Sequence, residues 1–135
     1  MRLCFFAALR EINKFTFLQL MITRKRDIIF TLIYFDEEIK IETHEGEFRN
    51  LMVLINEKFY VEDFGECKGI GRCGTCLVEV EGLNGLASEM ERNEKSTLKK
   101  CAVKKTNFRL SCQIMINAAL KNTIIKVVEE REDVR

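Results

Sequence analysis

The sequence predicts an α+β fold, from the order of its apolar patterns and from its length. Short runs rich in β-branched and aromatic residues, which are typical of strands, are separated by two stretches with helical spacing. Strands and helices do not alternate one for one, as they do in an α/β protein. With 135 residues, of which 47% are hydrophobic and 32% charged, the chain has the size and composition of one globular domain.

The first predicted elements are a pair of strands. Residues 27–35 are mostly apolar and too short for a helix of their own, so we expect a strand with both faces largely covered. Residues 39–43 alternate strictly between apolar and polar side chains, as in a strand with one face in water. The acidic residues 36–38 lie between the two runs, and a hairpin is therefore predicted.

Two helices are predicted. Asn50 is a suitable N-cap for a helix that runs to about Lys58 and buries one apolar stripe. The stripe consists of Leu51, Leu54, Ile55 and Phe59. Ser88 and Glu91 form a capping box, so we expect a second helix to follow it and to end near Lys100.

Three more strands complete the predicted sheet. Leu77–Glu81 alternates like a half-exposed strand and stops at a glycine. Ile114 and Ile116 flank Met115 in an expected short strand, and residues 123–128 close the sheet.

Four cysteines form the candidate site: Cys67, Cys73, Cys76 and Cys112. We interpret them as the ligands of an iron–sulfur cluster, because a cluster of two irons and two sulfides needs four thiolates around it. The C-x5-C-x2-C spacing of the first three allows one loop to wrap around such a cofactor. Glycines at positions 65, 69, 71 and 74 fit this interpretation, since a wrapping backbone needs positive φ values and a close approach. Its free N–H groups can then donate to sulfur and tune the potential.

These cysteines and their neighbours resemble the 2Fe-2S ferredoxins of the adrenodoxin and putidaredoxin type. The likeness is carried by the DFGEC run that ends at Cys67, the five-residue gap to Cys73, the CGTC run that ends at Cys76, and RLSCQI around Cys112. The plant-type pattern has a first gap of four residues instead. The resemblance covers roughly residues 27–128, which we predict to be the ferredoxin domain. It implies a β-grasp (ubiquitin-like) sheet and one 2Fe-2S cluster per chain.

The ligand set predicts an electron carrier and not an enzyme. Four thiolates leave no open position on iron, so the cluster can only gain or lose an electron. The chain has no glycine-rich nucleotide fingerprint, so its electrons come from and go to other proteins. The resemblance implies a flavoprotein reductase as donor, and as acceptor an oxygenase or monooxygenase, or the machinery of iron–sulfur cluster assembly. We expect a cytoplasmic monomer, in the mitochondrial matrix if eukaryotic, with no nucleic-acid partner and no transmembrane segment.

Docking to those partners is a separate question. In proteins that this chain resembles, the helix after the third cysteine presents acidic residues to its partners. The acidic residues Glu89, Glu91 and Glu94 match that region here. Basic residues interrupt them, namely Arg92, Lys95, Lys99 and Lys100. Electrostatic docking and an ordinary solvated helix surface are therefore both left open.

Two other uses of these cysteines fit the sequence less well. A structural zinc-binding interaction module is the alternative, but zinc sites usually have two close pairs of ligands, whereas Cys67 and Cys112 stand alone. A catalytic thiol needs a nearby base, and His44, the only histidine, lies far from the cysteines in the sequence and in a polar turn. The lone histidine also excludes a Rieske centre, which needs two.

The cysteine content also bears on the cellular compartment and leaves two cysteines outside the candidate site. Six cysteines without a secretory signal fit a reducing compartment. Cys101 is expected to be a small, half-buried residue near a helix end, and Cys4 gives no further signal.

Residues 1–26 lie outside the resemblance. They carry six basic side chains and one acidic one, which leaves a mildly acidic body of 16 basic and 20 acidic side chains. Three interpretations stay open: an extension upstream of a natural start at Met21, a basic amphipathic helix on a membrane surface, and a transit segment. The apolar run at residues 3–9 is too short to span a membrane. Residues 129–135 are expected to form a charged tail.

Overall fold

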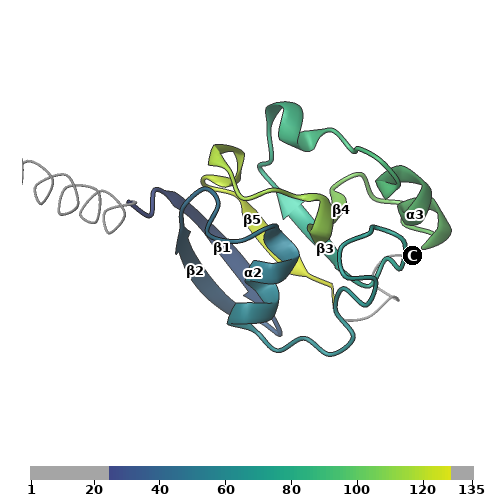
Figure 1. Ribbon diagram of the computed structural model, residues 1–135, viewed down its shortest axis with the longest axis horizontal. Helices are drawn as coiled ribbons and strands as arrows, with labels where there is room; N and C mark the ends of the chain where they lie inside the picture. The colour runs from purple at the N-terminus through teal and green to yellow at the C-terminus, as the bar shows by residue number, and fades with distance from the viewer. Residues whose placement is uncertain (1–24, 129–135) are drawn as a thin grey trace, which may run out of the picture.

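One five-stranded mixed sheet forms the centre of the molecule in the computed structural model, which describes residues 25–128 (Figure 1). The strand order is β2-β1-β5-β3-β4. The strands are β1 (Ile28–Tyr34), β2 (Glu37–Thr43), β3 (Leu77–Glu81), β4 (Phe108–Leu110) and β5 (Ile124–Val127). β5 runs parallel to β1 and antiparallel to β3 at the centre, while β2 and β4 form the antiparallel edges. The predicted α+β class is confirmed.

The β1–β2 hairpin is confirmed, but β1 is less covered than expected. Ile28, Phe30 and Leu32 are buried, whereas the residues between them are partly exposed. One face of the strand therefore faces the core and the other does not. Residues 27–35 are mostly apolar on both faces of the strand because β-branched and aromatic residues favour strands, and not because both faces are buried.

Helix α2 (Leu51–Lys58) begins and ends as the sequence predicts. The side chain of Asn50 accepts a hydrogen bond from the Val53 N–H at 3.0 Å, as an N-cap does. Leu51, Leu54 and Ile55 are fully buried. The helix packs its apolar stripe against the core next to the segment that carries Cys112.

Helix α3 (Glu94–Lys100) ends as expected but begins later than the capping box indicated. Ser88 instead ends a short 3-10 helix, η1 (Gly85–Ser88), and its hydroxyl donates to the Gly85 carbonyl. Arg92 has a φ of 55°, a left-handed conformation that a helix cannot pass through. The prediction of a helix that follows Ser88 directly was therefore wrong.

The strand expected at Ile114–Ile116 is also wrong, although both isoleucines are buried. β4 lies before Cys112 instead and pairs with β3, while Ile114 hydrogen-bonds through its carbonyl to the Leu51 N–H at 2.9 Å. The carbonyl of Ile114 therefore accepts a hydrogen bond from the first residue of α2 and not from a strand of the sheet.

Residues 1–24 and 129–135 lie outside the described part of the chain. The natural start at Met21, the role of the basic segment, the charged tail and the outer domain limits stay predictions. None of the helices described between residues 25 and 128 is long and apolar enough to cross a membrane.

Candidate metal centre

The loop that carries Cys67, Cys73 and Cys76 curls tightly between α2 and β3. Its glycines at positions 65, 69, 71 and 74 have φ values of 76°, 91°, 79° and 74°. This confirms the prediction that they supply positive φ, a region that L residues rarely adopt. A Cβ on Gly71 would lie 2.9 Å from Nε2 of Gln113, and one on Gly74 would collide with Sγ of Cys101. The loop therefore needs glycine there for space as well as for φ.

Thr75 holds the start of this loop to its end. Its hydroxyl oxygen accepts hydrogen bonds from the N–H groups of Gly65 and Glu66, both at 3.1 Å. The same hydroxyl lies 3.1 Å from Sγ of Cys73. One side chain thus fixes both the backbone before Cys67 and the thiol of Cys73. Sequence analysis did not single out Thr75.

Removing the hydroxyl of Thr75 should loosen the loop. In Thr75→Val, which keeps the side-chain shape, two backbone N–H groups lose their acceptor, and we expect a loss of about 1–3 kcal/mol in the free energy of unfolding. We also expect faster cluster loss, measured as the decay of visible absorption in the presence of a chelator. Thr75→Ser retains the hydroxyl and is the matched control. Equal decay rates for the two variants would contradict this role of the hydroxyl.

Cys112 is brought to the loop by a second set of hydrogen bonds. The N–H and the hydroxyl of Ser111 both donate to the Cys76 carbonyl at 2.9 Å. Nε2 of Gln113 donates to the Gly69 carbonyl at 3.2 Å, and Nδ2 of Asn50 donates to the Cys112 carbonyl at 3.2 Å. The chain around Cys112 is thus tied to α2 and to both ends of the cysteine loop.

Helix α3 contacts the other side of the same loop, as Figure 1 shows. The hydroxyl of Thr97 donates to the Gly71 carbonyl at 2.6 Å. Cys101, which caps the C-terminal end of α3, is half-buried against Gly74, which confirms the expected character of this residue.

The four thiols interact as two pairs. The largest single effect on Cys67 is burial, which raises its pKa. Hydrogen bonds from the backbone and thiol of Cys73 and from the N–H groups of Arg72 and Gly71 outweigh burial. Together they lower the pKa of Cys67 to about 6. A hydrogen bond from the Cys76 thiol is the largest effect on Cys112 and lowers its pKa to about 7 against burial. The same bond, with burial, raises the pKa of Cys76. Each pair thus contains one thiol that ionises readily.

This donor set fits a two-iron cluster. All four cysteines are free, and Nε2 of Gln113 donates to Sγ of Cys112 at 3.3 Å, as donors to a cluster ligand do. Among residues 25–128, no three histidine, cysteine, aspartate or glutamate side chains are grouped for a single metal ion. Two thiol pairs match a cofactor in which each iron takes two protein sulfurs.

A buried ion pair supports the fourth cysteine, and sequence reasoning missed it. Glu94 is 0% and Arg109 is 5% exposed. Nε and Nη2 of Arg109 donate to the two carboxylate oxygens of Glu94 at 2.7 and 3.0 Å, and the Leu110 N–H donates to Oε1 at 2.8 Å. Arg109 also donates to the carbonyls of Ala87 and Glu89. The pair joins the first turn of α3 to β4, just before Cys112.

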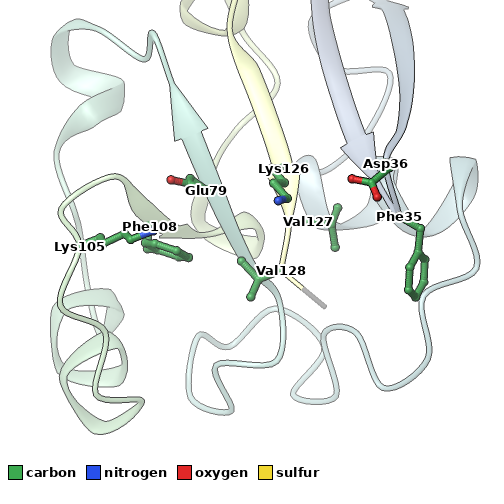
Figure 2. Close-up of a pocket in the computed structure, with 8 residues that line it drawn as sticks. All are labelled: Phe35, Asp36, Glu79, Lys105, Phe108, Lys126, Val127 and Val128. Carbon is green, nitrogen blue, oxygen red and sulfur yellow. The ribbon is translucent and has the colours of Figure 1, made fainter. Parts of the chain in front are cut away.

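A cavity of about 310 Å³ lies at another place, where β5 ends and β1 turns into β2 (Figure 2). Glu79 of β3 and Lys126 of β5 are cross-strand neighbours there, and Asp36 lies on the turn. No cysteine lines this cavity, so it is separate from the candidate metal centre.

Comparison with known proteins places this geometry in a family. A family model for the 2Fe-2S iron-sulfur cluster binding domain matches residues 37–117. The chain belongs to this family. Its cofactor is a 2Fe-2S cluster, and ferredoxins of this family are electron carriers.

Solved ferredoxins share the fold. A reduced putidaredoxin variant from Pseudomonas putida is 22% identical over 76% of this chain and 98% of that chain, with a TM-score of 0.61. A ferredoxin from Rhodopseudomonas palustris is 26% identical over 76% of this chain and 97% of its own, with a TM-score of 0.61. Putidaredoxin in a covalent complex with putidaredoxin reductase is 23% identical over 73% and 96%, with a TM-score of 0.58. The predicted putidaredoxin-type, β-grasp ferredoxin fold is confirmed.

Proposed function

We propose that this ferredoxin carries single electrons from a flavoprotein reductase to a second redox protein, with Cys67, Cys73, Cys76 and Cys112 as the cluster ligands. The observation that carries the proposal is the convergence of the two cysteine segments: Ser111 and Gln113, which flank Cys112, donate hydrogen bonds to the Cys76 and Gly69 carbonyls of the cysteine loop. When bound, the cluster supplies one-electron oxidation and reduction and no site for substrate. The protein's own residues position the sulfurs, donate hydrogen bonds to them and set the surrounding charge.

The partner classes rest on chemistry and on likeness. Residues 1–135 contain no nucleotide-binding fingerprint, which is consistent with delivery of the electron by a second protein. A similar fold is found in putidaredoxin bound to putidaredoxin reductase, which supports a reductase as donor. We propose an oxygenase or the machinery of cluster assembly as acceptor. A monomeric state and a cytoplasmic or matrix location stay predictions.

Spectroscopy of the purified protein tests the proposal. We expect two irons and two sulfides per chain, a brown colour that bleaches with dithionite, and a spin-half electron paramagnetic resonance signal only after reduction. A colourless protein with one zinc per chain, which iron and sulfide cannot convert, would instead support a structural zinc-binding module.

Charge in the cysteine loop should raise the reduction potential. Lys68 and Arg72 are exposed in this loop, and positive charge favours the reduced, more negative cluster. We expect Lys68→Gln and Arg72→Gln each to lower the midpoint potential by roughly 10–40 mV in a redox titration at low salt. Lys40→Gln, on the exposed strand β2, is the control. An unchanged or higher potential in the loop variants would refute the effect.

A further inference from the structure

The exposed side of α3 is basic. Lys95, Lys99 and Lys100 are exposed, whereas Glu94 is buried against Arg109 and contributes no charge to the surface. The exposed charged residues between positions 89 and 105 are Glu89, Glu91, Arg92, Lys95, Lys99, Lys100, Lys104 and Lys105. Six of these eight are positive. Of the three acidic residues that match the docking region of similar ferredoxins, Glu89 and Glu91 are exposed, whereas Glu94 is buried and is not available to a partner.

The opposite, buried side of α3 packs against the cysteine loop. Thr97 of α3 bonds the Gly71 carbonyl, and Gly71 precedes the exposed Arg72. Lys100 precedes Cys101, whose sulfur contacts Gly74. The loop itself carries exposed charges of both signs, Glu66, Lys68 and Arg72. We call the exposed residues Lys95, Lys99 and Lys100 of α3 the basic surface.

We propose that the basic surface is where an electron-transfer partner docks, and that the partner presents an acidic patch. The inference rests on the proposed electron-carrier function and adds the sign of the docking charge. The inner face of α3 contacts the backbone between Cys67 and Cys76, so a protein seated on the outer face is separated from the cluster ligands by one helix. Residues 25–128 form only three ion pairs, and no member of the basic surface takes part in them. Its charges are therefore available to a partner.

Charge of this kind acts mainly on the encounter rate. Complementary surface charge raises association rates by roughly 10- to 1000-fold at low ionic strength, and salt screens the effect. A basic docking surface predicts that reactions with acidic proteins slow as salt is added. For basic proteins it predicts that the reaction rate rises as salt is added, because salt screens the repulsion between like charges.

Two haem proteins of opposite charge test the sign. The reduced holoprotein is mixed in a stopped-flow instrument with cytochrome b5, which is acidic, or with cytochrome c, which is basic. We expect the rate with cytochrome b5 to fall steeply with ionic strength and the rate with cytochrome c to stay flat or rise. Lys99→Glu combined with Lys100→Glu should slow the cytochrome b5 reaction about tenfold at low salt.

The control variant and a second measurement separate the possible failures. Lys40→Glu changes charge by the same amount per residue on β2, away from α3, and should leave both rates near wild type. Binding of each haem protein to immobilised holoprotein is measured in parallel, since it needs no electron transfer. A protein without a reducible cluster would refute the carrier function, yet binding of cytochrome b5 in preference to cytochrome c would still support the basic surface. Preferential binding of cytochrome c, or equal effects of the α3 and β2 variants, would overturn it.

Discussion

Replacing Cys112 by alanine is expected to abolish the spin-half signal of the reduced protein and to reduce bound iron to below about a tenth of the wild-type content. The reason is the ligand balance: one iron would retain a single protein sulfur, and the thiol pair formed with Cys76 would be lost. The unfolding midpoint should fall as well, because cofactor binding stabilises the folded state alone. Iron assay, visible absorption and urea unfolding on the same sample check all three effects.

Cys101→Ala is the matched control, since Cys101 is a cysteine that contacts the same loop without belonging to either thiol pair. We expect this variant to retain the full iron content and the spectrum of the wild type. A loss of the cluster in Cys101→Ala together with its retention in Cys112→Ala would contradict the proposed ligand set.

The sequence predicts the cysteine loop well because its requirements are local. The loop cysteines and glycines lie within a dozen residues of one another, and each glycine adopts the positive φ that the loop requires at its own position. Asn50 and the helix after it follow the same logic, since an N-cap and an apolar stripe are also local. Tertiary contacts are not needed to recognise such features.

The errors concern residues that distant partners control. The capping box at Ser88 is a valid local signal, but Glu94 is drawn into a buried pair with Arg109, and the helix begins there instead. β4 is only three residues long and pairs with β3 across more than twenty-five positions, so no periodic pattern marks it. The role of Thr75 could not be recognised without the fold, because it depends on which backbone groups meet its hydroxyl. The lysines of α3 are visible in the sequence, but the burial of Glu94 is not.

Glu94→Ala is expected to lower the free energy of unfolding by about 3–5 kcal/mol, because it leaves the Arg109 guanidinium buried and unpaired. The Leu110 N–H loses its acceptor in the same step. Leu110 lies two residues before Cys112, so we also expect less iron per chain after purification. Urea unfolding of the holoprotein measures the first effect, and iron assay measures the second.

Two comparisons separate the ion pair from a general effect of the substitution. Glu91→Ala removes an exposed carboxylate from the turn before α3 and should change stability by no more than about 0.5 kcal/mol. Glu94→Met combined with Arg109→Met removes both charges and should recover a large part of the loss, since an apolar pair of similar volume often replaces a buried ion pair at little cost. If the double variant lost as much free energy of unfolding as Glu94→Met and Arg109→Met lose in sum, the loss would come from packing and not from the unpaired charge.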